Sequence, residues 1–325
     1  MKKKRLLLLT SGGDSPGMNA TIRSIVRTGC YHGLEIFACH DGYEGIVKQA
    51  IFPMQPQDVA NCIQRGGTII RSSRSPEFHH QEIRDKCRTF LKHEDIEYLV
   101  AIGGDGTFRG AALLEKEGGP KVIGIPGTID NDITGTDYTI GYDTARSNAV
   151  DAIDKIRDTA ASNSLYFLVE TMGRHAGFLA ADIALASGAE YVITPEFPIA
   201  MRDLAKQILA PKRKKNSLII IVAEGDHSGR SFKMAEELKT FTPSIEYRVC
   251  VLGHIQRGGS PTVTDRNTAS IMGSMAVENL LQGKSSCMTA LQNGKYVLAP
   301  FPEISLPAKR LNNDQLIKLL TTLST

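Results

Sequence analysis

The sequence has 325 residues, of which 42% are hydrophobic and 22% charged, and its formal net charge is +3. These values are typical of a folded protein with a sizeable core, and so small a charge argues against a nucleic-acid or membrane partner. Tryptophan is absent and aromatic residues total 6%, which argues against platforms for stacking bases.

The N-terminal segment MKKKRLLLLTSGGD has a basic start followed by an apolar run, as in a secretory signal peptide. The run Leu6–Leu9 is shorter than the apolar region of a signal peptide, and we interpret it as a buried first strand. No apolar run of the sequence is long enough to span a bilayer. The six cysteines form no CxxC or Cys/His metal spacing, which favours reduced thiols and a cytoplasmic location.

Short apolar runs alternate with helical patterns along the chain. Strands are predicted at Leu6–Leu9, Leu34–Cys39, Tyr98–Ile102, Val122–Ile125, Leu165–Glu170, Tyr191–Thr194, Leu218–Ala223 and Tyr247–Leu252. Helices are predicted at Gly17–Tyr31, Phe108–Glu115, Asp143–Thr159, Phe178–Ser187, Met201–Leu209 and Asp265–Leu281. This alternation predicts an α/β fold with mainly parallel sheets, and ligands are then expected at the carboxyl ends of the strands.

Two glycine-rich loops each follow a predicted strand and open a predicted helix: TSGGDSPGMN (Thr10–Asn19) and GGDGT (Gly103–Thr107). Glycines let backbone amides approach a phosphate, and a helix N-terminus favours anions. Asp105 lies where a phosphate-bound Mg²⁺ needs an oxygen ligand. For both loops the alternative is a tight turn without a ligand. A Walker A motif is absent, and LLQGKSS (Leu280–Ser286) is interpreted as the end of a helix.

The loop PGTIDND carries two acids, Asp130 and Asp132, directly after a predicted strand. In an extended segment, residues i and i+2 point the same way, so both carboxylates could face one substrate. Phosphoryl transfer to an alcohol needs such a pair, because one carboxylate accepts the hydroxyl proton and the other helps to hold Mg²⁺. An Asx turn with two solvated acids explains the loop equally well.

Basic residues follow two later strands. Arg174 lies in ETMGRHAG and could bind a sugar phosphate through two hydrogen bonds, although most arginines simply lie on the surface. His254 and Arg257 lie in VLGHIQRGGS and could form an anion pocket with Arg248. For His254 the alternative is a histidine satisfied within the core. A domain boundary is expected near Gly141, since the glycine-rich loops precede it and the Arg/His cluster follows.

The motifs TSGGDSPGMN, GGDGT, PGTIDNDITGTDYTIGYDTA, MGRHAG and VLGHIQRGGSP occur in this order, and together they resemble the bacterial ATP-dependent 6-phosphofructokinases. The resemblance runs from Leu6 to about Gln292. It implies two similar Rossmann-like three-layer domains with the active site in the cleft between them. An ATP-binding domain is expected at 1–140 plus 255–304 and a sugar-phosphate-binding domain at 141–254 plus 305–325.

The resemblance also implies a reaction and its residues. The γ-phosphoryl group of ATP would pass to the 1-hydroxyl of fructose 6-phosphate, a step of glycolysis, with Asp130 as general base. Arg74, Thr128, Asp132 and Arg174 would be the other catalytic residues. ATP would be bound by Gly13, Arg74, Gly104, Asp105, Gly106 and Thr107, with Asp105 on Mg²⁺. Fructose 6-phosphate would be bound by Thr128, Ile129, Asp130, Met172, Gly173, Arg174, Glu224, Arg248, His254 and Arg257.

Two glycines bear on the phosphoryl donor. In pyrophosphate-dependent relatives an Asp replaces Gly106 and a Lys replaces Gly127, which would fill the space of the nucleotide. Glycine at both positions therefore favours ATP. One departure concerns the sugar phosphate: Leu165 stands where the family has an arginine supplied by a neighbouring subunit. A missing charge-assisted hydrogen bond is worth about 1.5–3 kcal/mol.

The family's homotetramers bind ADP or phosphoenolpyruvate as effectors between subunits. The matching residues here are Arg23, Arg27, Arg157, Glu190, Arg213 and Lys215. An arginine expected just before Asp58 is absent. Three rival functions are a kinase acting on NAD or diacylglycerol, which share GGDGT, a non-catalytic regulatory subunit, and a pyrophosphate-dependent enzyme. The specific motifs PGTIDND and GHIQRGG argue against the first rival.

Overall fold

The computed structural model describes residues 3–210, 216–225, 229–302, 309–311 and 314–323. The chain divides into two compact units. Unit 1 comprises Met1–Ile129, Ile133–Thr144 and Arg257–Ala308, and unit 2 comprises Asp130–Asp132, Ala145–Gln256 and Lys309–Thr325. The three-residue segment Asp130–Asp132 therefore belongs to unit 2, although its neighbours on both sides in the sequence belong to unit 1.

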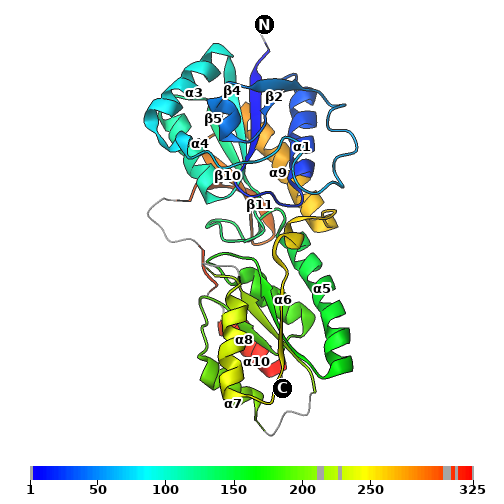
Figure 1. Ribbon diagram of the computed structural model, residues 1–325. Coiled ribbons are helices and arrows are strands. Elements are labelled where there is room, and N and C mark those ends of the chain that lie inside the picture. The colour runs from blue at the N-terminus through cyan, green and yellow to red at the C-terminus, as the bar shows by residue number, and fades with distance from the viewer. Residues whose placement is uncertain (1–2, 211–215, 226–228, 303–308, 312–313, 324–325) are drawn as a thin grey trace. The chain divides into compact units, whose positions relative to one another are not determined.

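Unit 1 is built on a seven-stranded sheet of order β11-β10-β5-β4-β1-β2-β3 (Figure 1). Neighbouring strands are parallel except for β2 with β3 and β10 with β11. The strands are β1 (Arg5–Ser11), β2 (Glu35–Cys39), β3 (Ile51–Met54), β4 (Ile96–Gly103), β5 (Lys121–Pro126), β10 (Cys287–Gln292) and β11 (Lys295–Pro300). Its helical elements are α1 (Met18–Tyr31), α2 (Tyr43–Val47), η1 (Glu77–His79), α3 (Gln81–His93), α4 (Asp105–Lys116) and α9 (Val263–Leu281).

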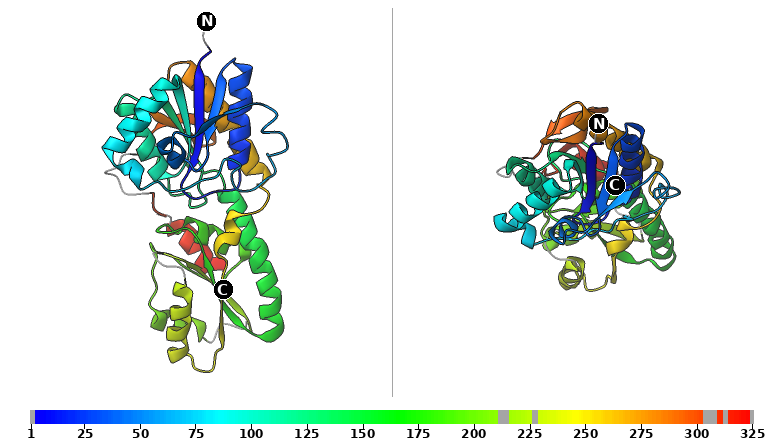
Figure 2. Two further views of the ribbon diagram at one scale, coloured as in Figure 1. Left: turned by 45° about the horizontal axis from the view of Figure 1, so that its top comes forward. Right: turned by 90° about the horizontal axis from the view of Figure 1, so that it is seen from above.

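The core of unit 1 has two layers because successive strand residues point to opposite faces of the sheet. In β1, Leu6 and Leu8 pack in one cluster with apolar residues of α1 and α9. Leu7 and Leu9 pack in another with residues of α2, α3 and α4. Every one of these leucines is fully buried. Figures 1 and 2 show the two groups of helices on opposite faces of the sheet.

The strand register brings three loops of unit 1 to the same edge of the sheet. Ser11, at the end of β1, lies opposite Gly103 at the end of β4. Gly103 in turn lies opposite Pro126 at the end of β5. The glycine-rich loops after β1 and β4 and the start of PGTIDND are therefore neighbours, as expected for the ligand-binding edge of a parallel sheet.

Unit 2 is built on a four-stranded parallel sheet of order β7-β8-β6-β9. Its strands are β6 (Tyr166–Thr171), β7 (Tyr191–Ile193), β8 (Leu218–Ala223) and β9 (Tyr247–Val251). Helices α7 (Met201–Ile208) and α8 (Arg230–Phe241) share an apolar cluster with Ile220 and Val222 of β8, and α6 (Phe178–Ser187) also packs on β8. Helix α10 (Asp314–Leu323) contacts α6. Helix α5 (Tyr142–Asn163) begins in unit 1 and continues in unit 2, and η2 (Gly253–Arg257) ends at the boundary.

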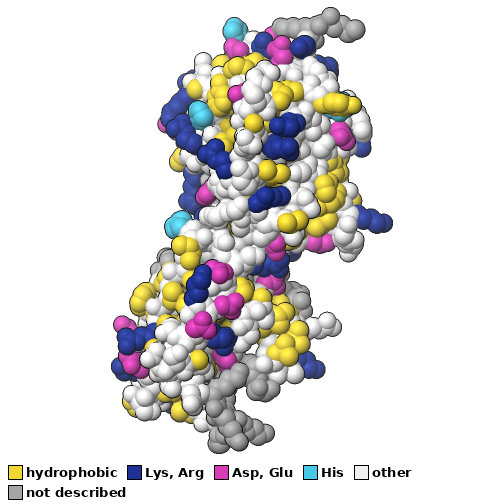
Figure 3. Space-filling model, turned by 90° about the vertical axis from the view of Figure 1, so that its right-hand side faces the viewer, with side chains coloured by type: hydrophobic (Ala, Val, Ile, Leu, Met, Phe, Trp, Pro, Cys, Tyr) yellow, Lys and Arg dark blue, Asp and Glu magenta, His cyan; other side chains and the backbone are white. Residues whose placement is uncertain are grey.

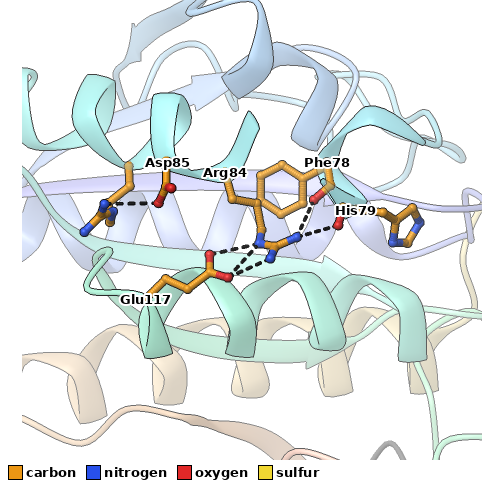
Figure 4. Close-up of polar contacts among 6 residues, drawn as sticks. Phe78, His79, Arg84, Asp85 and Glu117 are labelled. Atoms are coloured by element: carbon orange, nitrogen blue, oxygen red, sulfur yellow. Dashed lines mark hydrogen bonds and ion pairs between the residues drawn. The ribbon is translucent and has the colours of Figure 1, made fainter. Parts of the chain in front are cut away.

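A buried arginine joins three elements of unit 1 (Figure 4). Arg84 of α3 forms hydrogen bonds from Nε and Nη2 to the carboxylate of Glu117, which follows α4, at 2.9 and 2.6 Å. Its Nη1 donates to the carbonyl oxygens of Phe78 and His79 at 3.1 and 2.8 Å. The pair raises the pKa of Arg84 and lowers that of Glu117. Arg84 thus fixes the far end of the helix that begins in the GGDGT loop.

The predicted α/β fold is confirmed. Each strand predicted from sequence is present with its ends displaced by at most two residues. Strands β3, β10 and β11 and helices α2, α3, α8 and α10 were not among the predicted elements. Helix α9 ends at Leu281, so the interpretation of LLQGKSS as a helix end is confirmed.

The surface of the described residues is mixed in character. On the face drawn in Figure 3, basic and acidic side chains are interspersed with apolar and uncharged ones. Across the parts of the chain that the structure describes, none of the helices combines the length and apolarity needed to cross a membrane.

Candidate active site

The loop after β1 depends on close backbone approaches within unit 1. Gly12 and Gly17 have φ values of 88° and 107°, in the region that favours glycine. A Cβ on Gly13 would lie 2.6 Å from Nη1 of Arg257. The same Nη1 donates a hydrogen bond of 2.7 Å to the carbonyl oxygen of Asp14. Arg257, predicted as a sugar-phosphate ligand, therefore packs over the first glycine-rich loop.

The GGDGT loop turns directly from β4 into α4. A Cβ on Gly103 would lie 2.3 Å from Oγ1 of Thr107 and 2.4 Å from the carbonyl oxygen of Ser11, so the loop packs tightly on β1. A Cβ on Gly104 or Gly106 would meet nothing within 4 Å. These two glycines therefore leave open space beside the N-terminus of α4, where an anion is favoured.

Two side chains of the GGDGT loop are arranged differently. Thr107 is buried, and its hydroxyl donates to the carbonyl oxygen of Ser11 at 3.1 Å. Asp105 has a buried Oδ1 that forms no hydrogen bond with the described residues. Burial raises the pKa of Asp105, and the charge of Arg109 opposes this shift. A buried carboxylate oxygen without a hydrogen bond can accept a metal ion, so Asp105 fits a Mg²⁺ that takes its other ligands from phosphate and water.

Arg74 lies on an exposed loop of unit 1 whose neighbouring residues are fixed. The backbone amide of Gly12 donates to Ser73 O at 3.3 Å, and Ser72 Oγ donates to Gly12 O at 2.8 Å. Ser75 Oγ donates to Glu44 at 2.9 Å. Arg74 itself is exposed and has no hydrogen bond or ion pair with the described residues. The loop is thus held against the first glycine-rich loop while the Arg74 guanidinium is available to a ligand.

The segment after β5 is held by a second strand-like segment. Gly127 forms an isolated parallel bridge with Ile140, and the amide of Ile140 donates to Pro126 O at 2.9 Å. The hydroxyl of Thr139 donates to Thr128 O at 2.7 Å. A Cβ on Gly127 would meet side chains of Ile102 and Met18 at 3.0 and 3.2 Å. At Gly127, unlike Gly106, the adjacent space is filled by protein, and Ile129 is fully buried.

Asp265, a residue that sequence reasoning missed, organises this second segment. It is fully buried in α9 and accepts hydrogen bonds from the amides of Gly141 and Thr144, both at 2.8 Å. The hydroxyl of Thr144 donates to it at 2.6 Å. Burial raises the pKa of Asp265, and these hydrogen bonds oppose the shift. The pattern Thr262-x-x-Asp265, in which Thr262 Oγ1 accepts from the Asp265 amide at 3.3 Å, is a helix-start signal that could have drawn attention to it.

Asp130 and Arg174 are brought together within unit 2. Asp130 is 2% exposed, and its Oδ2 lies 3.6 Å from Nε of Arg174. The Arg174 side chain is 45% exposed, so part of it is accessible to a ligand. Arg174 has φ 50°, and its amide donates to Glu224 Oε1 at 3.1 Å. A buried carboxylate beside a partly exposed guanidinium can remove a proton from a substrate that the arginine holds.

The other predicted substrate residues of unit 2 follow β6, β8 and β9. Met172 and Gly173 lie directly after β6, and Gly173 has φ 132°. His254 is exposed, so the alternative of a histidine satisfied within the core is wrong. Arg248, on the edge strand β9, is also exposed and lies 2.6 Å from Glu246. Arg257 belongs to unit 1, whereas Arg248 and His254 belong to unit 2.

Three further supports of the unit 2 loops escaped sequence reasoning. Glu170 is buried at the end of β6 and accepts hydrogen bonds from the amide and hydroxyl of Ser231, at 2.9 and 2.7 Å. Asp132 O accepts a hydrogen bond of 3.1 Å from the amide of Lys309, near the C-terminus. Glu196 accepts from the amides of Gly177 and Leu311 at 3.0 and 3.1 Å. The C-terminal segment 309–311 thus contacts the loop that carries both acids.

The described effector residues are divided between the two units. In unit 2, Arg157 Nη1 lies 3.5 Å from Oε1 of the buried Glu190. In unit 1, Arg23 and Arg27 occupy successive turns of α1. Burial raises the pKa of the nearby Cys62 thiol, and the charges of Arg23 and Arg27 partly oppose this shift. Arg213 and Lys215 lie outside the described residues.

Comparison with known proteins identifies the family. Residues 5–280 match the family model described as Phosphofructokinase. The ATP-dependent 6-phosphofructokinase of Coxiella burnetii is 50% identical over 300 residues, which cover 92% of each chain. ATP-dependent 6-phosphofructokinase 1 of Thermus thermophilus is 49% identical over 310 residues, covering 95% of this chain and 96% of that protein. A solved phosphofructokinase structure from Saccharomyces cerevisiae has a TM-score of 0.85 and 32% identity, covering 98% of this chain and 46% of the yeast chain.

Proposed function

The chain belongs to the phosphofructokinase family, and we propose that it transfers the γ-phosphoryl group of ATP to the 1-hydroxyl of fructose 6-phosphate. The products are fructose 1,6-bisphosphate and ADP, and the reaction is a step of glycolysis. One structural observation carries the chemistry: a buried Asp130 lies 3.6 Å from a partly exposed Arg174. A base and an anion-binding group are thus adjacent, as transfer to the hydroxyl of a sugar phosphate requires.

In this proposal unit 1 binds the nucleotide. The phosphates lie against the open side of Gly104 and Gly106, where the N-terminus of α4 supplies backbone N–H groups. Arg74 stabilises charge on the transferring phosphoryl group, and its loop is fixed by Ser72, Ser73 and Ser75. Gly13 is proposed to bind ATP through its backbone. A side chain at this position would clash with Arg257, which packs directly over it.

Asp105 is the residue of this proposal that holds Mg²⁺. Its buried Oδ1 forms no hydrogen bond with the described part of the chain, so a cation there compensates the cost of the buried charge. When bound, Mg²⁺ neutralises charge on the phosphate oxygens. Asp105 itself would hold this cation beside the phosphates at the helix N-terminus. Asp132 is proposed to help position substrate and metal through its carboxylate, while its carbonyl is hydrogen-bonded to Lys309.

Unit 2 binds the sugar phosphate in this proposal. Asp130 accepts the proton of the 1-hydroxyl as general base, with Thr128 helping to position the acceptor. Arg174, Arg248 and His254 present exposed cationic or hydrogen-bonding groups to the 6-phosphate, and Arg257 supplies a further guanidinium from unit 1. Met172, Gly173 and Glu224 bind the sugar, with Glu224 also fixing the Arg174 backbone at 3.1 Å. Thr128 and Ile129 complete the proposed set.

ATP is favoured over pyrophosphate as the donor. The relatives at 49% and 50% identity are named ATP-dependent enzymes. The open space beside Gly106 supports the same choice, because the Asp of pyrophosphate-dependent relatives would enter it. The space beside Gly127 is not open in this way, because a side chain there would first have to displace Met18 and Ile102.

Oligomeric state and regulation belong to the same proposal. We expect a cytoplasmic homotetramer in which ADP or phosphoenolpyruvate binds near the Arg23–Arg27 and Arg157–Glu190 groups. Leu165, half-buried before β6, cannot supply the charge that the family's arginine provides. Replacing it with arginine is expected to tighten fructose 6-phosphate binding by roughly tenfold or more.

A coupled assay of the purified chain tests the proposed reaction. Fructose 6-phosphate and Mg²⁺ are supplied with either ATP or pyrophosphate, and ADP or phosphate release is followed beside an Asp130→Ala control. Turnover with ATP alone, lost in the control, is the expected result. Absence of turnover with both donors, in protein that still binds ATP, would refute the kinase proposal and favour a regulatory subunit.

A further inference from the structure

Gln256 is a buried amide that lies between two proposed substrate residues, His254 and Arg257, yet has no assigned role. It is 0% exposed, whereas His254 is exposed. Its Oε1 accepts a hydrogen bond of 2.9 Å from the backbone amide of Met172. An N–H donor requires an acceptor, so this contact fixes which end of the Gln256 amide faces Met172.

The hydrogen bond joins two loops that leave adjacent strands of unit 2. Glu170 of β6 lies opposite Val251 of β9, and the amide of Leu252 donates to Glu170 O at 3.0 Å. Beyond these paired residues the two segments diverge: the one after β6 forms the 172–174 loop, and the one after β9 forms the turn η2. The hydrogen bond between Gln256 and Met172 therefore joins these two segments again beyond the end of the sheet.

Hydrogen bonds to residues outside it help to hold the 172–174 loop in its shape. Gly173 and Arg174 both have positive φ, at 132° and 50°, and such a conformation is unfavourable for the arginine. The Met172 amide donates to Gln256, the Arg174 amide donates to Glu224, and Gly173 O accepts from the Ala176 amide. The Gln256 contact lies two residues before Arg174, and the Glu224 contact is made by the Arg174 amide itself. Both therefore act close to the side chain whose Nε lies 3.6 Å from Asp130.

We propose that Gln256 is a positioning residue for the sugar-phosphate loop, acting through the Met172 amide to hold Arg174 beside Asp130. Gln256 is fully buried, so its side chain has no exposed surface with which to contact a substrate. Its Nε2 forms no hydrogen bond within the described chain. The acceptor oxygen is therefore the functional end of the side chain, and the proposal rests on fructose 6-phosphate being the ligand of unit 2.

The acceptor requirement separates two substitutions of Gln256. Gln256→Leu has similar bulk but no acceptor, and leaves the buried Met172 amide without its partner. Gln256→Glu keeps an oxygen at the same position. A control is Thr242→Val, because Thr242 is also buried in unit 2 and its hydroxyl forms hydrogen bonds with Leu238 O and Tyr247 Oη, both at 2.8 Å. The control measures the general effect of losing buried hydrogen bonds in unit 2.

The primary measurement is the KM for fructose 6-phosphate and for ATP in all four proteins. Gln256→Leu is expected to raise the KM for fructose 6-phosphate by about tenfold, the effect of one lost hydrogen bond, and to change that for ATP by less than about twofold. Gln256→Glu and Thr242→Val are expected to stay within about threefold of the native KM values. An equal rise for both substrates in Gln256→Leu, or the same rise in Thr242→Val, would overturn the positioning role.

Hydrogen exchange of the Met172 amide tests the contact independently of activity. Gln256→Leu is expected to accelerate this exchange at least tenfold while protection in β8 is retained, because only the local contact is lost. Unchanged Met172 exchange would overturn the proposal even if the KM values changed. If the native protein did not phosphorylate fructose 6-phosphate, the proposed function would fail, and the exchange result would still decide whether Gln256 holds the loop.

Discussion

The two units place loops at the same structural position, the carboxyl ends of parallel strands, but equip them differently. In unit 1 the loops after β1 and β4 are rich in glycine, and open space lies beside Gly104 and Gly106. In unit 2 the loop after β6 carries Arg174, which lies 3.6 Å from Asp130 of the segment that follows β5. The first arrangement offers backbone N–H groups to a ligand, and the second offers ionisable groups.

This difference indicates how each unit tolerates change. A backbone site is damaged by added atoms, because the phosphate must approach the chain closely. A side-chain site is damaged by removing a charge, because the proton transfer and the anion contact depend on individual groups. Substitutions that add bulk in unit 1 and remove charge in unit 2 should therefore have separable kinetic effects.

The largest expected effect is the loss of the base in unit 2. Asp130→Asn keeps the side-chain shape but cannot accept the hydroxyl proton, so kcat is expected to fall by about 10³. Mg²⁺–ATP binding by unit 1 should remain within about twofold of native, since no nucleotide contact is removed. Steady-state kinetics and calorimetric titration with ATP measure the two quantities. A variant that retains more than a tenth of the native kcat would contradict the assignment of Asp130.

The next effect concerns added atoms in unit 1. Gly106→Asp is expected to lower kcat/KM for ATP by about 100-fold, because a carboxylate enters the open space beside the phosphates. Gly103→Ala should instead destabilise the fold by about 1–3 kcal/mol, since its Cβ would clash with Thr107 and Ser11. Kinetics and urea unfolding of both variants provide the comparison. Equal destabilisation by the two substitutions would show that the space at Gly106 is not open.

The third effect is on stability alone. Arg84→Met leaves the Glu117 carboxylate without its guanidinium and is expected to lower the free energy of unfolding of unit 1 by about 3 kcal/mol. Lys48→Met removes an exposed partner of Glu44 and should cost less than about 0.5 kcal/mol. Urea unfolding measures both. Similar values for the two variants would mean that burial adds little to the Arg84–Glu117 pair.

The smallest effect is a pH dependence at Asp105. Because burial raises its folded-state pKa, the folded chain holds this proton more tightly than the unfolded chain. The resulting stability is present below the ordinary Asp pKa and is lost as pH rises through the raised value. The test compares Asp105→Asn with the native protein in the absence of Mg²⁺ and nucleotide. As the pH rises from 4 to 7, the Tm of the variant relative to that of the native protein should increase by about 2 °C. The exposed Asp151→Asn is the control, and a gain no larger than in this control would contradict the prediction.

The sequence predicted the strands that carry the site because their apolar runs are uninterrupted. It missed β3, whose Pro53 disfavours a strand but is tolerated at the sheet edge. It missed the β10–β11 hairpin, although Asn293-Gly294 is a strong turn signal between the two strands. Helix α3 buries only Arg84, Cys87 and Leu91, so its apolar stripe is too narrow to recognise from periodicity.

Site residues were predictable where a motif carried them and unpredictable where tertiary contacts did. GGDGT and PGTIDND drew attention to Asp105 and Asp130 directly. Asp265 and Gln256 act by accepting hydrogen bonds from backbone amides far away in sequence, and no local pattern encodes the amide that each one meets. The burial of Thr107 and the exposure of His254 likewise depend on packing.

The contact between Lys309 and Asp132 bears on the order in which the protein is synthesised. The loop that carries Asp130 emerges from the ribosome directly after β5. The amide that donates to Asp132 O, and the Leu311 amide that donates to Glu196, emerge more than 170 residues after that loop. A nascent chain can therefore pair the strands of unit 1 up to β5 before it acquires the contact between Lys309 and Asp132.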